Sequence, residues 1–407
     1  MKIFFASANC LIDPSSGAAR SVATFLSYLT RSGHECQTLT GSIYDKPLMD
    51  NPIENIQANG GTPVQSERGE LNIWRQDIGG VQHLIFPTLI SNRSYVPARD
   101  ELKIFRHAMT YLDLKKPEVF MTYGNGLLER SLLREARDRG IATFFYLAHP
   151  SYKEERVFKD VDQVFTDTEA TRALYNERFN FGAYAIGKFI IRPRLPTNGS
   201  PQVYATFINP AAEKGVTLFY RIAQIAESEL PELKFLVVES RSTLEQADER
   251  LSTRFSKLSN IVRVGLQQDM GRVFGMTRIL LMPSLWHESG GRAAIEALSL
   301  GIPVISTNRG GLPETLGNAP IMLSVGPDLI ENPKLLPDES EARPWIEALT
   351  KLMTDQKFYQ ERQRSSLEQW KTHDPELRMS AIIERMQLVL ARKKKLRPGP
   401  ASSMEAR

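Results

Sequence analysis

Two successive series of short apolar runs, each alternating with longer segments of helical period, constrain the fold of this chain more than any other feature. The runs of the first series lie at residues 2–8, 34–40, 83–87, 118–123, 141–147 and 163–166. Those of the second series lie at residues 202–208, 234–238, 261–264, 279–282 and 303–306. This alternation is typical of parallel sheets covered by helices on both faces, so we predict an α/β fold of two doubly wound, Rossmann-like domains.

A segment rich in Pro, Asn, Gly and Ser at residues 192–201 separates the two series and indicates a linker. The predicted organisation is a first domain at 1–190, a linker at 191–201, a second domain at 202–373, a C-terminal helix at 374–391 that packs back on the first domain, and a basic tail at 392–407. Ligands of such sheets bind beyond the carboxyl ends of the strands, so the two domains are expected to face each other across a cleft. Residues 45–70 lack an apolar period and are expected to form a long surface excursion.

The net charge of +4 comes from the end of the chain. Residues 392–407 hold six basic side chains and one acidic one, which leaves a net charge of −1 for the remainder. Binding to a phosphate backbone relies on a basic excess, so we expect no nucleic-acid partner. The tail is predicted to be a solvated end, and attraction to an anionic membrane surface stays open as an alternative.

Cysteine usage and hydropathy bear on the compartment. Cys10 and Cys36 are too few for a disulfide framework, which favours a reducing environment. No apolar run approaches the roughly 18 residues that span a bilayer, and Met1 leads directly into a strand-like run. We therefore predict a cytoplasmic protein, with peripheral contact at the inner membrane face as the open alternative, and the spacing of the six histidines suggests no metal site.

Residues 280–316 contain most of the candidate functional residues. Gly290 and Gly291 precede a helical segment at 292–300, and unpaired backbone N–H groups at such a helix start can bind an anion such as a diphosphate. Glu288 stands just before this site, and Glu296 lies inside the apolar helix. A buried carboxylate needs a partner, which here is either an Arg or Lys in an internal ion pair or the hydroxyls of a ribose.

This stretch resembles the carboxy-terminal signature of family-4 retaining glycosyltransferases of the GT-B fold. The resemblance rests on the spacing of Glu288 and Glu296 and on the tail that runs Gly310-Gly311-Leu-Pro-Glu314. It implies that Glu288 contacts the donor sugar, that Glu296 contacts the ribose, and that the backbone amides at Gly290 and Gly291 bind the diphosphate. It also suggests that Glu314 lies near the donor phosphates, whereas a role as a backbone cap is the alternative.

A second part of the resemblance follows the first strand after the linker. Lys214 matches a lysine that holds the donor diphosphate in this family. Asn209 stands five residues earlier, where the family usually carries an arginine. The positive charge that this arginine usually supplies to the donor diphosphate is therefore expected from another residue, with Arg292 and Arg309 as candidates.

The first half of the chain matches the family less closely. Gly17 and Arg20 follow the first strand and are similar to the Gly-rich acceptor-side loop of the family. His149 follows a later strand, where the family often places a histidine that touches the donor sugar. Asn125 lies in a strand-to-helix turn between two glycines and is a candidate to face a ligand, although a plain tight turn is the alternative.

The resemblance implies a retaining glycosyltransferase that moves a sugar from a nucleotide-diphosphate donor to an acceptor hydroxyl of a glycan, a lipid-linked molecule or a small molecule. Glu288, Lys214 and His149 are the candidate catalytic residues, and no metal or cofactor is expected. Two alternatives remain open: a nucleotide-sugar epimerase of the same fold, and a non-catalytic nucleotide-sugar-binding subunit of a partner transferase.

Overall fold

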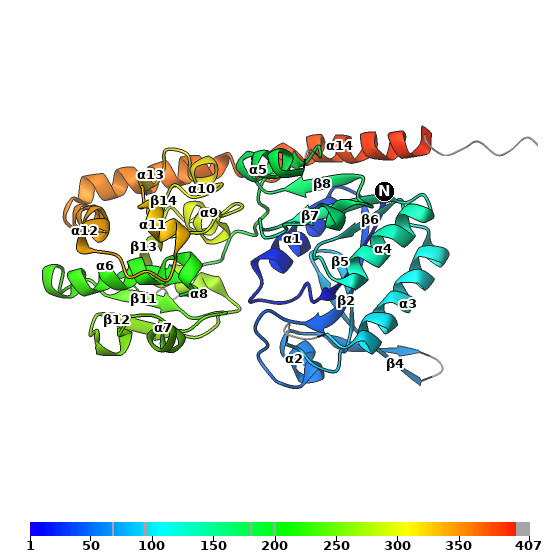
Figure 1. Cartoon of the computed structure of the whole chain (residues 1–407), viewed down its shortest axis with the longest axis horizontal. Helices are drawn as coiled ribbons and strands as arrows, with labels where there is room; N and C mark the ends of the chain where they lie inside the picture. Colours follow the sequence, from blue (N-terminus) through cyan, green and yellow to red (C-terminus); the bar gives the residue numbers. More distant parts are fainter. Residues whose placement is uncertain (67–68, 93–95, 180, 198–200, 396–407) are drawn as a thin grey trace, which may run out of the picture.

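The computed structural model describes residues 1–66, 69–92, 96–179, 181–197 and 201–395, which form two α/β domains side by side (Figure 1). The first sheet has the strand order β3-β4-β5-β2-β1-β6-β7-β8-β9. Its strands are β1 (Lys2–Asn9), β2 (Glu35–Ile43), β3 (Thr62–Ser66), β4 (Gly69–Ile78), β5 (Val81–Phe86), β6 (Val119–Thr122), β7 (Ala142–Leu147), β8 (Gln163–Thr166) and β9 (Tyr184–Ala185). From β5 to β9 the neighbouring strands pair in parallel, whereas β3, β4 and β5 pair antiparallel.

Helices cover both faces of this sheet. They are α1 (Gly17–Arg31), α2 (Pro52–Ala58), α3 (Ala98–Lys115), α4 (Leu127–Asp138) and α5 (Glu169–Phe179), with a short 3-10 helix η1 (Glu155–Phe158). One apolar core packs α1 against the sheet, and a second core packs α3, α4 and α5 against the opposite face. All residues of β6, β7 and β8 are buried, as expected for central strands of a parallel sheet with two covered faces.

The second sheet is parallel throughout, with the strand order β12-β11-β10-β13-β14-β15. Its strands are β10 (Tyr204–Ile208), β11 (Phe235–Val238), β12 (Ile261–Val264), β13 (Thr277–Met282), β14 (Val304–Thr307) and β15 (Ile321–Leu323). The helical segments are η2 (Ala212–Lys214), α6 (Val216–Glu229), α7 (Leu244–Arg250), η3 (Phe255–Lys257), α8 (Met270–Met276), α9 (Arg292–Ser299), α10 (Leu312–Leu316), α11 (Pro327–Glu331), α12 (Glu339–Thr354) and α13 (Gln356–Lys371). Helices α6, α7 and α12 share one core with this sheet, and α8, α9 and α10 share the other.

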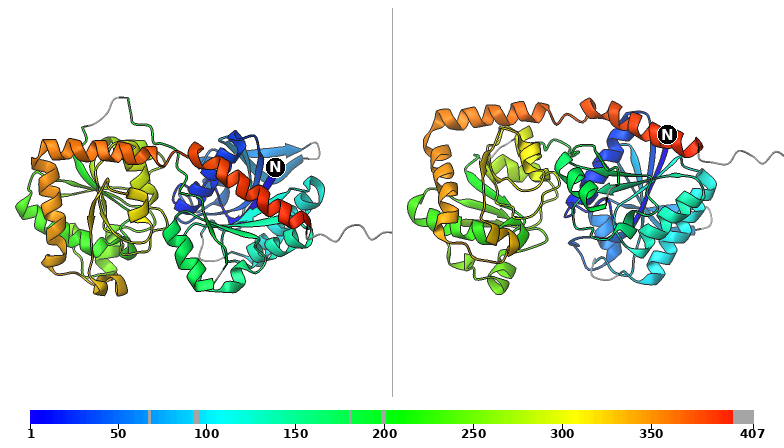
Figure 2. Two further views of the ribbon diagram at one scale, coloured as in Figure 1. Left: turned by 90° about the horizontal axis from the view of Figure 1, so that it is seen from above. Right: turned by 45° about the horizontal axis from the view of Figure 1, so that its top comes forward.

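The last helix, α14 (Glu376–Lys395), leaves the second domain and lies on the first (Figure 2). Its residues Met379, Ile382, Met386 and Val389 are buried in the core that also contains α1. Arg385 Nε donates to Gln163 Oε1 at 2.7 Å, next to this apolar contact. The helix continues to Lys395, so the first four residues of the segment expected as a basic tail are helical; residues 396–407 lie outside the described part of the chain.

The expectation for residues 45–70 was wrong in part. This stretch contains α2, β3 and the start of β4, and β3 and β4 pair antiparallel at the edge of the first sheet. Edge strands need less apolar sequence than central ones, so the stretch lacked the pattern that identified the other strands. None of the helices in the described part of the chain combines the length and apolar character needed to cross a membrane.

Candidate active site in the interdomain cleft

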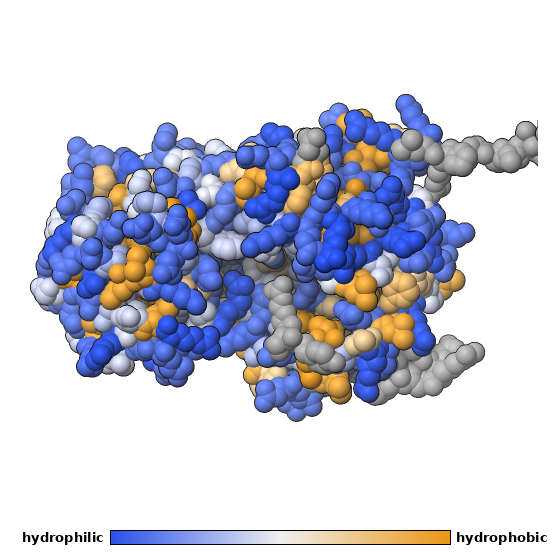
Figure 3. Space-filling model, viewed as in Figure 1, coloured by the Kyte–Doolittle hydropathy of each residue, from blue (hydrophilic) through white to orange (hydrophobic). Residues whose placement is uncertain are grey.

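A cleft of about 660 Å³ lies between the two domains. Loops that follow β1 and β7 line it from the first domain, and loops that follow β10, β11 and β13, with the start of α9, line it from the second. Figure 3 shows the groove between the two halves of the molecule on this face, bordered mainly by hydrophilic residues. The cleft therefore lies at the carboxyl ends of the strands of both sheets, where doubly wound folds bind ligands.

Most of the site residues expected from the sequence meet in this cleft. Those that line it are Gly17, Arg20, His149, Asn209, Lys214, Glu288, Gly291, Arg292 and Glu296. Asn125, Gly290 and Glu314 are not among its lining residues.

Lys214 and Glu288 form an ion pair on the second-domain wall of the cleft. Ser284 Oγ donates a second hydrogen bond to Glu288 Oε1 at 2.7 Å. Burial of Glu288 would raise the pKa of its carboxyl, but the charge and hydrogen bond of Lys214, with the Ser284 hydroxyl, hold this pKa below its usual value. Glu288 is therefore a buried carboxylate that stays ionised at neutral pH.

Backbone contacts fix the position of Lys214 relative to the loop that carries Glu288. The carbonyl of Glu213 accepts the N–H groups of Leu285 and Trp286, each at 3.0 Å. Gly215 has a φ of +82°, and a Cβ at this position would lie 1.9 Å from the carbonyl oxygen of Pro283. A glycine is thus required where the Lys214 turn passes against the Glu288 loop.

The start of α9 forms the floor beside this ion pair. Gly291 caps the helix with a φ of +54°, and a Cβ there would lie 2.5 Å from Leu312 Cδ2. No acidic residue occupies the first turn of α9, whose residues Arg292 and Ala293 line the cleft. The positive end of the helix dipole therefore faces the cleft close to Lys214, as a diphosphate site requires.

Glu296 has the cationic partners that its burial demands. Arg292 Nε lies 2.9 Å from Glu296 Oε1, one helical turn away, and Arg20 Nη2 from the first domain lies 3.9 Å from the same oxygen. Burial lowers the pKa of Arg292 to about 10, against the opposing effect of the Glu296 charge. Of the two partners considered from the sequence, the structure thus supplies the arginine, and Glu296 still borders the cleft where a ribose could reach it.

Asn209 has a structural role at the end of β10. Its φ is +60°, a left-handed conformation that asparagine tolerates better than most residues. Its Oδ1 accepts the N–H of Ser242 at 3.2 Å and so ties the loop after β10 to the loop after β11. The latter loop carries Arg241, which lines the cleft and pairs with Asp45 of the first domain at 3.6 Å.

The first-domain wall is built around the N-terminus of α1. Ser16 caps this helix by accepting the N–H of Ala19, and Gly17 follows in the cleft. Buried Asp13 accepts the N–H and hydroxyl of Ser15 and the N–H of Asp45, which fixes the loop before the helix. Burial raises the pKa of Asp13 to about 6, against these hydrogen bonds.

His149 follows β7 and also lines the cleft. Its ring stacks on Tyr152, with 5.0 Å between ring centroids, and its Nδ1 lies 2.7 Å from Ser151 Oγ. The position agrees with the expectation from the sequence, and a role in sugar binding stays a prediction.

Glu314 makes a contact between the domains instead of facing the cleft. Its two carboxylate oxygens accept the N–H groups of Glu169 and Ala170 at 3.0 and 3.1 Å, at the start of α5. The alternative of a backbone cap therefore describes its observed contacts, although the capped helix belongs to the other domain. Asn125 is exposed in the loop before α4, and Arg309 donates to the carbonyl of Leu285 at 3.3 Å and does not line the cleft.

Sequence reasoning missed three charged residues at this junction. Lys188, in the segment after β9, lines the cleft and pairs with the buried Asp167 at 2.6 Å. Arg241 faces Asp45 from the other wall. No local pattern identifies these pairs, because Asp167 and Lys188 lie in different loops of the first domain, and Asp45 and Arg241 lie in different domains. Within the described residues, no group of three or more His, Cys, Asp or Glu side chains is placed to hold a metal ion.

The overall fold is that of known glycosyltransferases. Sucrose-phosphate synthase from Thermosynechococcus elongatus matches with a TM-score of 0.65 at 14% identity, over 96% of this chain and 100% of that chain. HepE from Anabaena, solved with UDP-glucose, matches with a TM-score of 0.65 at 12% identity, over 95% of this chain and 100% of that chain. The pneumococcal O-GlcNAc transferase GtfA, solved with UDP and GlcNAc, matches with a TM-score of 0.66 at 12% identity, over 96% of this chain and 99% of that chain.

These likenesses show that the chain has the GT-B fold, as the sequence predicted. Residues 188–368, which include most of the second domain, match the family model described as glycosyl transferases group 1. No curated protein matches the sequence at a significant level. The predicted GT-B fold is thus confirmed, whereas the glycosyltransferase activity, the family-4 subtype and the retaining stereochemistry stay predictions.

Proposed function

We propose that this chain transfers a sugar, with retention of configuration, from a nucleotide-diphosphate donor to an acceptor hydroxyl. The observation that carries the proposal is the Lys214–Glu288 ion pair beside the start of α9, inside the cleft between the two domains. This arrangement places a lysine, a helix N-terminus and a buried carboxylate within one site. Such a set suits an anionic leaving group next to a sugar.

The leaving diphosphate gains negative charge as the glycosidic bond breaks. Lys214 and the N–H groups at the start of α9 would stabilise this charge electrostatically, the role that a divalent metal plays in other transferases. We therefore propose transfer without a resident metal. Lys214 is held by Glu288 in the free protein, so donor binding would redistribute this lysine between the carboxylate and the phosphate.

Glu288 and Glu296 would orient the donor by accepting hydrogen bonds from sugar and ribose hydroxyls. Both carboxylates are already held by cations, which supports a binding role over that of a nucleophile. We favour front-face return of the acceptor, assisted by the departing phosphate. His149, Gly17 and Arg20 line the opposite wall and would meet the sugar and the acceptor.

Uridine nucleotides are the first donors to test, because HepE and GtfA were solved with UDP-containing ligands. The purified protein would be incubated with a panel of UDP- and GDP-sugars, with and without a panel of glycan, lipid-linked and small-molecule acceptors. Nucleotide release that depends on an acceptor supports transfer, and the anomeric configuration of the product, read by NMR, tests retention. An altered donor in the absence of acceptor would support an epimerase, and nucleotide binding without turnover would support a non-catalytic subunit.

The same assay tests the metal proposal. Activity that persists in the presence of a chelator is expected. Loss of transfer with chelator and its return with magnesium or manganese would contradict this part of the proposal.

A further inference from the structure

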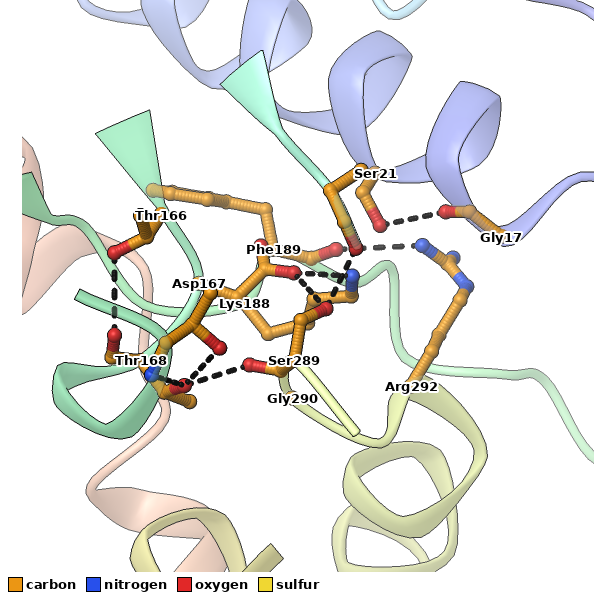
Figure 4. Close-up of polar contacts among 12 residues, drawn as sticks. Gly17, Ser21, Thr166, Asp167, Thr168, Lys188, Phe189, Ser289, Gly290 and Arg292 are labelled. Carbon is orange, nitrogen blue, oxygen red and sulfur yellow. Dashed lines mark hydrogen bonds and ion pairs between the residues drawn. The ribbon is translucent and has the colours of Figure 1, made fainter. Parts of the chain in front are cut away.

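A buried ion pair with no role so far lies where the two domains meet (Figure 4). Lys188 Nζ is 2.6 Å from Asp167 Oδ2, and the two side chains are 6% and 0% exposed. Burying such a pair is costly unless further hydrogen bonds complete it. Tyr146 donates its hydroxyl to Asp167 Oδ1 at 2.7 Å. Ser289 Oγ lies 2.8 Å from Asp167 Oδ2 and 2.6 Å from the carbonyl oxygen of Ala148, so these two acceptors share its one hydroxyl hydrogen.

The contacts of this pair cross between the domains. Asp167 follows β8 and Lys188 follows β9, both in the first domain, whereas Ser289 belongs to the second-domain loop after β13. Thr168 Oγ1 donates to the carbonyl of Ser289 at 2.8 Å. A Cβ on Gly290 would lie 3.2 Å from Asp167 Cβ and 3.3 Å from Lys188 Cβ, so the backbone of this loop packs directly on the pair.

The loop held in this way joins the two elements of the donor wall. Glu288 immediately precedes Ser289, and Gly291 immediately follows Gly290 as the cap of α9. Arg292 Nη1 donates to the carbonyl of Phe189, next to Lys188, at 3.3 Å. A displacement of the loop at Ser289 would therefore shift both the Glu288 carboxylate and the start of α9.

We propose that Asp167 and Lys188 are positioning residues of the transfer reaction, which hold the Ser289–Gly290 backbone against the first domain and thereby fix Glu288 and the start of α9 for the donor. This inference rests on the proposed function of the cleft. If the inference holds, residues of the first domain help to set the geometry of the donor site on the second domain.

The charge of Lys188 supports this role. Burial raises the pKa of Glu288, and three groups lower it: Lys214 by its charge and hydrogen bond, the Ser284 hydroxyl by its hydrogen bond, and Lys188 by its charge. Besides Lys214 and Lys188, His287 of the same loop is a titratable group next to Glu288, and its own pKa is lowered by burial and by the charge of Arg309. Removal of the lysine charge should therefore raise the pKa of Glu288.

The test separates positioning from plain stabilisation. Lys188→Met leaves Asp167 buried without its cation, and Asp167→Asn leaves the lysine unpaired, so either single variant can lose stability for that reason alone. The double variant Asp167→Asn/Lys188→Met removes both charges. We expect its melting temperature to be higher than that of either single variant and close to that of the wild type. The matched control is Asp162→Asn/Lys393→Met, which removes another pair, at 2.8 Å, that ties α14 to the first domain away from the cleft.

Two readouts decide the proposal. Hydrogen–deuterium exchange followed by mass spectrometry should show faster exchange of residues 285–293 in the double variant, and not in the control, whether or not a donor is known. With a donor from the panel, the double variant should lose kcat by about tenfold or more with little change in KM, as expected for misplaced groups. The acid limb of the pH profile of Lys188→Met should move to higher pH, and Lys188→Arg should restore it.

A double variant that exchanges and turns over like the wild type would overturn the inference. Absence of turnover by the wild type on every donor and acceptor would instead contradict the proposed function, and the exchange measurement would still decide whether the pair holds the loop.

Discussion

Arg20 of α1 and Glu296 of α9 face each other across the cleft, with 3.9 Å between Arg20 Nη2 and Glu296 Oε1. The same oxygen lies 2.9 Å from Arg292 Nε. One carboxylate is thus shared between its own helix and the opposite domain. A ligand that hydrogen-bonds to Glu296 would do so next to two arginines, one from each wall.

Glu296→Gln should weaken nucleotide binding. A hydrogen bond to a charged group contributes about 1.5–3 kcal/mol, which corresponds to roughly a 10- to 150-fold higher Kd. Calorimetric titration with UDP and GDP measures this, and Glu384→Gln on the exposed face of α14 is the matched control. Unchanged affinity of the Glu296 variant, in a protein that binds the nucleotide, would remove Glu296 from the donor site.

Lys214→Met should lower kcat strongly and have little effect on the stability of the fold. Loss of one preorganised donor to a developing negative charge costs about 10²- to 10³-fold in rate. Lys257→Met, an exposed lysine of the same domain, should have no effect on turnover. Full activity of the Lys214 variant would show that the diphosphate is stabilised by other groups.

Asp13 should make stability depend on pH between about 4 and 6. Burial raises the pKa of this carboxyl from 3.8 to about 6, so the folded protein binds a proton that the unfolded chain has already released in this range. The contribution of protonated Asp13 to the free energy of unfolding is therefore complete below about pH 4 and is lost as the pH rises through about 6.

Asp13→Asn should remove this pH dependence. The difference in unfolding free energy between the variant and the wild type, from urea denaturation at a series of pH values, should move in favour of the variant from pH 4 to pH 7. A constant difference over this range would show that Asp13 has an ordinary pKa in the folded state.

Gly215→Ala should destabilise the second domain and disrupt the active site together. The φ of +82° and the 1.9 Å approach to the Pro283 carbonyl leave no room for a methyl group. Strain of this kind costs of order 1–3 kcal/mol. Gly182→Ala, where a Cβ would meet nothing within 4 Å, is the control for urea denaturation and should behave as the wild type. Equal midpoints for both variants would contradict the requirement for glycine.

Local patterns in the sequence were enough for the strands of the two sheets other than β3, β4, β9 and β15, and for much of the donor wall. Apolar runs identified the buried strands, and the Glu288 and Glu296 spacing placed both carboxylates in the cleft. The hairpin of β3 and β4 was missed because edge strands carry little apolar pattern. The partners of Glu314 and of Lys188 lie in distant segments of the chain, so no pattern of neighbouring residues could reveal them.

The chain leaves the first domain after β9 and returns to it at α14. A Cβ on Gly187, just after β9, would lie 1.5 Å from Nη1 of Arg378 in the first turn of α14. The two covalent connections between the domains therefore meet at one place, beside the start of α14. The Asp45–Arg241 pair and the Asp167–Ser289 contact also join the two domains, so any movement that separates the domains has to break both contacts.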